Sequence, residues 1–99
     1  MLNIEYLQES YNRIKNYLVR TPIVVSENLN KDLNSKIYLK NEVEQLTGSF
    51  KIRGALSALS NLKTKGINGV VAYSSGNHAQ GVSKAAQIFD MHAIIVMPE

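Results

Sequence analysis

The hydrophobic positions at the start of the chain recur at alternating spacings of three and four residues, which predicts an amphipathic helix. Asn3 stands where a capping side chain is needed before the first turn. The apolar face of this helix consists of Ile4, Leu7, Tyr11, Ile14 and Leu18. Pro22 ends the pattern, because proline has no amide proton and disfavours helix in the residue before it.

The segment that follows predicts only short elements. Residues 23–25 form an apolar extended piece, and Ser26 can cap a short helix that carries Leu29 and Leu33. Residues 36–42 alternate well enough to predict a strand. Its side chains, which include Tyr38, Lys40 and Glu42, are interpreted as packing and surface residues. A tight turn is expected at Gly48.

The second half of the chain predicts a helix and then a strand–helix–strand unit. The helix begins at Ile52, ends before Gly66, and has one apolar face formed by Ile52, Leu56, Leu59 and Leu62. Residues 70–73 predict a short buried strand, and residues 94–97 predict another strand that Pro98 ends. The helix between them has an inner face formed by Val82, Ala85, Ala86 and Phe89.

Strand, helix and strand in this order predict a parallel sheet with a right-handed crossover. A parallel sheet needs helices on both of its faces. The sequence stops directly after a strand whose next helix is missing. We therefore expect residues 1–99 to be a single, partial α/β domain, the N-terminal part of a larger fold.

Composition narrows the possible functions. The chain has no cysteine and two histidines, so disulfides, thiolate nucleophiles and a protein-built metal site are not expected. The net charge of +3 comes from lysines and arginines scattered without a basic stripe, so no nucleic-acid partner is expected. No apolar run approaches the ~20 residues that span a membrane, and the N-terminus lacks signal-peptide features. We expect a soluble, cytoplasmic protein without a membrane partner.

Residues 47–55, Thr-Gly-Ser-Phe-Lys-Ile-Arg-Gly-Ala, place Lys51 in the first turn of a predicted helix. The partial positive charge of a helix N-terminus disfavours an ammonium group there. A lysine whose neutral amine is favoured is a better nucleophile toward a carbonyl, as Schiff-base chemistry requires. Phe50 and Ile52 predict that this turn is packed rather than free. The alternative is an ordinary solvated surface lysine.

A second polar segment, Ser-Ser-Gly-Asn-His at residues 74–78, lies between a predicted strand and a predicted helix. Ligands of open α/β sheets bind at this edge, and such side chains before a helix N-terminus suit a carboxylate or phosphate. The alternative is ordinary helix capping by Ser74, Ser75 or Asn77, but one cap needs only one such residue. We interpret the segment as a binding loop, with His78 as a loop contact rather than a general base.

The two segments together resemble the fold-type II pyridoxal-phosphate enzymes, and among them the threonine/serine dehydratases and serine racemases. The matching residues are 20–22, 40–44, 47–55 and 74–81. The order of elements follows the family over nearly the whole chain, and the two motifs in combination are highly specific. The resemblance implies a three-layer, parallel-sheet α/β fold of the tryptophan-synthase-β-like kind, truncated in this chain.

The resemblance also implies a role for each matching residue. Lys51 would hold pyridoxal 5′-phosphate as an internal aldimine and later act as the base at the substrate α-carbon. Phe50 would pack beside the cofactor ring, and Asn77 would hydrogen-bond its 3′-oxygen. The residues implied for the substrate carboxylate are Ser74, Ser75, Asn77 and His78.

The implied reaction is ammonia-lyase chemistry. Threonine or serine loses its β-hydroxyl, with the cofactor as electron sink, and yields a 2-oxo acid and ammonia. The family setting implies amino-acid metabolism, such as isoleucine biosynthesis, and a homo-oligomer as the full-length protein.

Ser75 departs from the many bacterial threonine dehydratases that carry alanine at this position. Serine there resembles the racemases, in which it stands on the opposite face of the cofactor from the lysine. Racemisation needs two proton-transfer groups on opposite faces, whereas elimination needs only one. A serine racemase or a bifunctional racemase/dehydratase is therefore the alternative activity, with Ser75 as a second catalytic candidate.

Two parts of the family's site have no candidate among these residues: the glycine-rich loop for the cofactor phosphate and the residue that faces the pyridine nitrogen. The six glycines of the chain are dispersed. We therefore expect the parent protein to be an enzyme and the isolated chain to be inactive. The alternative outside the enzymes is a non-catalytic α/β interaction domain, which would bind no cofactor.

Overall fold

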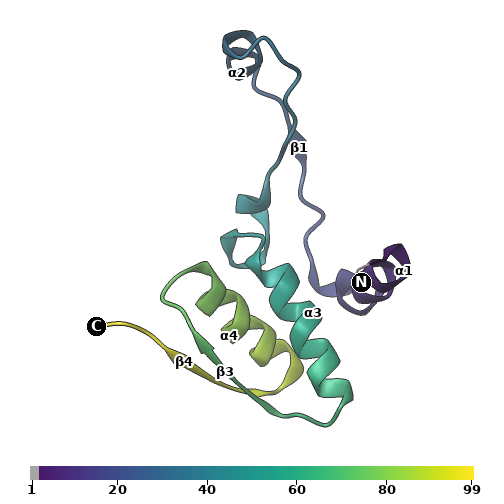
Figure 1. The fold of residues 1–99 in the computed structure, drawn as a ribbon, viewed down its shortest axis with the longest axis vertical. Coiled ribbons are helices and arrows are strands. Elements are labelled where there is room, and N and C mark those ends of the chain that lie inside the picture. Colours follow the sequence, from purple (N-terminus) through teal and green to yellow (C-terminus); the bar gives the residue numbers. More distant parts are fainter. Residues whose placement is uncertain (1–2) are drawn as a thin grey trace.

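The computed structural model describes residues 3–99, which form a body of helices and sheet and an extended arm (Figure 1). The body contains α1 (Ile4–Ile14), α3 (Lys51–Thr64), β3 (Gly69–Tyr73), α4 (Asn77–Phe89) and β4 (His92–Val96). The arm contains β1 (Ile23–Val24), α2 (Glu27–Asp32) and β2 (Leu39–Lys40). Short 3₁₀ turns lie at Lys15–Tyr17, Glu42–Glu44 and Leu46–Gly48. None of the helices within 3–99 is long and apolar enough to cross a membrane.

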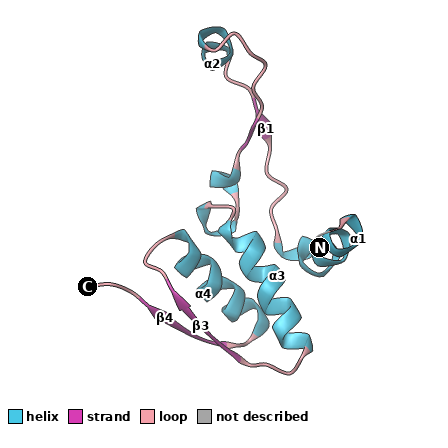
Figure 2. Ribbon diagram, in the orientation of Figure 1, coloured by secondary structure: helices cyan, strands magenta, loops and turns pink. Residues whose placement is uncertain are grey.

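The predicted strand–helix–strand unit is confirmed. β3 and β4 pair in parallel, with Val71 opposite Ile94 and Tyr73 opposite Val96, and α4 connects them (Figure 2). The inner face of the sheet, which packs against the core, carries Val70, Ala72 and Ile95. The outer face carries the exposed side chains Val71, Tyr73, Ile94 and Val96, so the expected burial of the strand at 70–73 is wrong for this face. The described residues thus cover one face of the sheet.

The core lies between α3, α4 and the sheet, and the predicted apolar faces of both helices point into it. Ile52 and Leu56 of α3 are fully buried, and Leu59 joins them. From α4 the buried members are Val82, Ala85 and Ala86. Leu62 and Phe89 are half-buried and pack against this cluster. The hydrophobic periodicity therefore identified the contact between the two helices that carry the candidate site.

The first helix begins as predicted, because the Asn3 side chain accepts a hydrogen bond from the amide of Tyr6 at 2.8 Å. Its α-helical part ends at Ile14 and not at Leu18, so that boundary was wrong. A 3₁₀ turn tightens the chain there, and Leu18 packs against the core from beyond it. α1 contacts α3 through paired hydroxyls of Ser10 and Ser57, while its apolar residues Ile4, Leu7 and Tyr11 are exposed.

The arm is an antiparallel ladder of two residues on each side, with Ile23 opposite Lys40 and Val24 opposite Leu39. Ser26 caps α2 as predicted and accepts from the Leu29 amide at 3.3 Å. The predicted strand over 36–42 is wrong for most of its length. The Ile37 amide donates to the side chain of Asn30 at 2.8 Å instead of to a strand, and a 3₁₀ turn begins at Glu42.

Candidate functional site

Lys51 is the first residue of α3, and a tight turn delivers it there. Thr47 and Gly48 both have left-handed backbones, with φ of 68° and 69°. Glycine adopts this region freely, whereas a β-branched threonine is strained in it. The Gly48 amide donates to the carbonyl of Gln45 at 2.7 Å, and the Ser49 hydroxyl accepts from the Lys51 amide at 3.4 Å. The turn expected at Gly48 is confirmed and fixes where the lysine helix begins.

The Lys51 side chain is exposed and lies against the ring of Phe50. Its Nζ is 5.2 Å from the ring centroid, within the range of a cation–π contact. The prediction of a turn packed on both sides holds for Ile52, which is fully buried, but is wrong for Phe50, which is 59% exposed. Because the ring of Phe50 is exposed and Lys51 lies against it, both side chains are on the open side of the turn.

The loop before α4 is tied to the edge of the sheet. The Ser74 amide donates to the carbonyl of Val96 at 3.0 Å, and the Ser74 hydroxyl accepts from the Gly76 amide at 3.3 Å. Within 3–99, no side chain caps α4, so the serines and Asn77 do not perform the ordinary capping function. The first amides of α4 therefore point outward without a side-chain acceptor, at the positive end of the helix.

Two hollows flank Phe50 and bring the motifs together. One, of about 320 Å³, is bordered by Lys51 and His78 as well as Phe50. The other, of about 420 Å³, is bordered by Phe50, Ser49 and Asn77. The structure thus gathers four predicted site residues: Phe50, Lys51, Asn77 and His78. In the described chain Ser74 and Ser75 border neither hollow, although they belong to the same loop.

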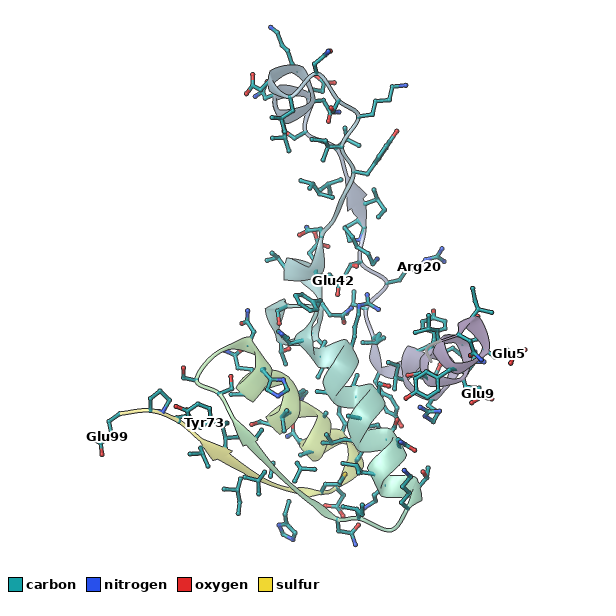
Figure 3. All side chains as sticks on the ribbon, in the orientation of Figure 1. Glu5, Glu9, Arg20, Glu42, Tyr73 and Glu99 are labelled. Atoms are coloured by element: carbon teal, nitrogen blue, oxygen red, sulfur yellow. The ribbon has the colours of Figure 1, made fainter. Side chains whose placement is uncertain are left out.

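A charged cluster anchors the lysine helix to the base of the arm. The carboxylate of Glu42 accepts two hydrogen bonds from the Arg53 guanidinium, each 2.8 Å long, and one from the Thr21 hydroxyl. Figure 3 shows Glu42 where the arm joins the body. The Arg53 hydrogen bonds, opposed by partial burial and aided by Thr21 and nearby Lys40, lower the pKa of Glu42 to about 2. The same pair raises the pKa of Arg53 above its ordinary value.

Glu42, interpreted from the sequence as a packing and surface residue, is half-buried and holds the start of α3 to the arm through Arg53. The sequence contained a signal that Arg53 needs an anionic partner but not which one, because Arg53 is the third residue of α3, where the helix dipole disfavours a cation. A cation in that position calls for a nearby carboxylate. Gln45 carries no comparable signal, yet it is buried, and its side chain bonds both the amide and the carbonyl of Val19.

The fold also gathers basic residues that are scattered along the sequence. A hollow of about 270 Å³ is bordered by Tyr11, Lys15, Arg20, Lys40 and Arg53. Helical periodicity could not predict this arrangement, because these residues come from separate elements. Glu42 neutralises part of the charge through its ion pairs with Lys40 and Arg53.

Glu42→Gln tests the anchoring cluster in the full-length protein. The pKa of Glu42 falls from 4.5 to about 2 on folding, so the unfolded chain binds the proton more readily. The carboxylate therefore stabilises the fold above about pH 4.5, and this contribution is lost as the pH falls toward about 2. We expect Glu42→Gln to lower the free energy of unfolding by about 1–2 kcal/mol at pH 7.

This value is below the ~3.4 kcal/mol that the whole pKa shift would give, because the side chains are 16% and 31% exposed and solvent screens them. Urea unfolding at pH 7 and pH 3.5 measures the difference. Glu44→Gln is the matched control, since Glu44 is exposed and receives a hydrogen bond from Asn41. A cost that is equal for both variants, or that does not shrink at low pH, would contradict the prediction.

Comparison with known proteins places this geometry in a family. Residues 14–99 match the family described as pyridoxal-phosphate dependent enzyme. The chain is 48% identical over 99 residues to an L-threonine ammonia-lyase of Thermotoga maritima, covering 99% of this chain and 25% of that protein. It is 47% identical over 92 residues to an L-threo-3-hydroxyaspartate ammonia-lyase of Saccharomyces cerevisiae, covering 92% and 28%.

A solved structure of maize serine racemase matches with a TM-score of 0.89 and 38% identity, covering 97% of this chain and 30% of that one. The chain thus spans between a quarter and a third of the length of these relatives. The fold class expected from the resemblance, the α/β fold of the fold-type II enzymes, is confirmed. With the family match extending over residues 14–99, the chain belongs to the pyridoxal-phosphate-dependent enzymes.

Proposed function

We propose that the protein containing this chain is an ammonia-lyase of the threonine/serine dehydratase type, with Lys51 as its cofactor lysine. The observation that carries the proposal is the position of Lys51 on the first turn of α3, where it shares one hollow with Phe50 and His78. The similarity to ammonia-lyases acting on threonine and on hydroxyaspartate supports a hydroxy amino acid as substrate. The 99-residue chain alone, a partial domain, is proposed to be inactive.

The residues present fit pyridoxal 5′-phosphate. The hollows on either side of Phe50, about 320 and 420 Å³, lie within the ~300–1,000 Å³ range of small-molecule sites. Lys51 would hold the cofactor aldehyde, the exposed ring of Phe50 would pack beside the pyridine, and Asn77 would bond its 3′-oxygen. When bound, the cofactor supplies an electron sink for the α-carbon of an amino acid.

The chain's own residues would do the remaining work at the substrate. The amine of Lys51 removes the α-proton, as a positioned general base. The backbone amides at the start of α4, which no described side chain caps, suit the substrate carboxylate as hydrogen-bond donors. The side chains proposed to bind that carboxylate are Ser74, Ser75, Asn77 and His78. With the carboxylate held, the β-hydroxyl leaves as water, and hydrolysis of the released enamine by water gives a 2-oxo acid and ammonia.

Borohydride labelling of the full-length protein tests the cofactor assignment. We expect reduction in the presence of pyridoxal phosphate to fix the cofactor on Lys51, and mass spectrometry of the peptides to find it there. Lys51→Ala should lose the label, whereas Lys40→Met should keep it, because the amine of Lys40 instead bonds the carbonyl of Thr21 at 3.1 Å. Absence of any label in the wild type would favour a non-catalytic α/β interaction domain.

A serine racemase or bifunctional racemase/dehydratase is the second candidate. The observation that favours it is Ser75, an exposed hydroxyl in the loop that precedes α4. The similarity to maize serine racemase adds support. A hydroxyl on the cofactor face opposite Lys51 would supply the second proton transfer that racemisation requires.

The setting of the enzyme is part of the same proposal. Cytoplasmic localisation and a place in isoleucine biosynthesis rest on the likeness to threonine ammonia-lyase, and cell fractionation and growth without isoleucine test them. A homo-oligomer is proposed for the full-length protein. Its support is the apolar face of α1, where the side chains of Ile4, Leu7 and Tyr11 are exposed and need a covering surface.

A further inference from the structure

Gly81 lies where α4 comes closest to the start of α3. A Cβ atom added to Gly81 would stand 3.2 Å from the carbonyl carbon of Lys51. It would also stand 3.3 Å from the Lys51 carbonyl oxygen and from the Ile52 amide nitrogen. All three distances are shorter than the 3.4 Å at which ordinary van der Waals contact begins. The neighbours are helix backbone atoms, so no side-chain rotation can relieve the contact.

Backbone conformation does not explain a glycine at this position. The glycines with positive φ are Gly48 and Gly66, whereas Gly81 lies inside α4. Glycine is the poorest residue for a helix interior after proline, so local propensity favours alanine. Elsewhere in helix or strand, an added Cβ would meet nothing within 4 Å at Gly54 and only His92, at 3.8 Å, at Gly69. The close approach of α3 is the physical reason for glycine at 81.

The contact at Gly81 lies near the N-terminal end of α4, and this end of the helix is continuous with the binding loop at residues 74–78. α4 begins with Asn77 and His78, about one helical turn before Gly81. His78 shares a hollow with Lys51, and Asn77 borders the hollow on the other side of Phe50. Because protein interiors are close-packed, an added methyl group would push this helix end away from Lys51.

We propose that Gly81 is a positioning residue that holds the N-terminal end of α4, with residues 74–78, at a fixed distance from Lys51. Gly81 acts through the backbone of Lys51 and Ile52 and needs no contact with cofactor or substrate. This inference rests on the proposed function, since the distance matters if Lys51 binds the cofactor and the loop binds the substrate. Functional sites require geometry held within about 0.5 Å.

The test compares Gly81→Ala with Gly69→Ala in the full-length protein. Both variants add one methyl group, but at Gly69 it meets only His92 at ordinary contact distance. The measurements are the dissociation constant of pyridoxal phosphate, the absorption maximum of the bound cofactor, and KM and kcat. We expect Gly81→Ala to raise the dissociation constant of the cofactor and to lower kcat/KM about tenfold, which is less than the roughly hundred-fold loss of rate that a full 1 Å displacement can cause. Its absorption maximum should shift, while Gly69→Ala should match the wild type.

The outcomes separate this inference from the proposed function. A wild type that takes no borohydride label at Lys51 refutes the proposed function. A labelled wild type whose Gly81→Ala variant keeps the constants and spectrum of Gly69→Ala overturns the role of Gly81, even if its thermal stability falls. A purely structural glycine would lower stability alone.

A second pair of variants covers the case in which Gly81→Ala yields no soluble protein. Ile52→Val removes one methyl group from a fully buried side chain whose own amide meets the methyl group added at Gly81, so it offsets part of the added volume. The double variant Gly81→Ala/Ile52→Val is then compared with Ile52→Val. A weaker cofactor affinity together with a kcat/KM about tenfold lower supports the positioning role, and equal constants overturn it.

Discussion

Replacement of Lys51 by alanine is expected to lower the turnover of L-threonine and L-serine by the full-length protein at least a thousand-fold. The variant loses two contributions together, the covalent attachment of the cofactor and the amine that moves the α-proton. Positioned acid–base groups alone contribute roughly 10²–10⁴-fold to a rate. The fold should survive, because the Lys51 side chain is exposed and its described contact is with the Phe50 ring.

Formation of 2-oxo acid, measured under saturating pyridoxal phosphate, is the assay. Lys84→Ala is the matched control, since Lys84 lies on α4 and its amine bonds only Gln87 among the described residues, at 2.8 Å. Added methylamine should restore part of the activity of Lys51→Ala, because it replaces the missing amine. Turnover within tenfold of the wild type would mean that Lys51 is neither the attachment point nor the base.

The parts of the fold predicted correctly from the sequence are those with local signals. The spacing of Ile52, Leu56 and Leu59 fixed a helix and its buried face, and caps at Asn3 and Ser26 marked helix starts. The predicted strand over 36–42 was wrong because its pairing is not local. It depends on the two residues of β1 and on the Asn30 side chain, which takes the amide of Ile37.

In the candidate site, too, the features with local sequence signals could be predicted, and those that depend on packing could not. The positions of Lys51 and of residues 74–78 at helix starts could be predicted, because each motif is contiguous and spans the start of a helix. The exposure of Phe50 could not be predicted from the sequence, since the side that Phe50 faces depends on how α3 packs. Glu42 and Gly81 act on residues distant in the sequence, through Arg53 and through the backbone of Lys51. Their roles become visible when α3, α4 and the arm are placed together.

Ser75→Ala is expected to separate the two candidate reactions. Racemisation of serine requires a proton to leave one face of the α-carbon and another to arrive on the opposite face. If Ser75 supplies the second transfer, its loss should lower racemisation at least a hundred-fold, the lower range for a positioned acid–base group. Dehydration uses the amine of Lys51 alone for proton transfer at the α-carbon and should change little.

The measurement follows D-serine and pyruvate from the same L-serine reaction, so that one protein sample reports both activities. Ser83→Ala is the matched control, because Ser83 is an exposed serine on α4, beyond the binding loop. Ser75→Gly should behave as Ser75→Ala, whereas Ser75→Thr, which keeps a hydroxyl, should retain part of the racemisation. Equal loss of both products would assign Ser75 to carboxylate binding, since a weaker grip on the substrate slows elimination and racemisation alike. Retention of both would show that Ser75 is not the second proton-transfer group, and a residue elsewhere in the full-length protein would have to supply that transfer.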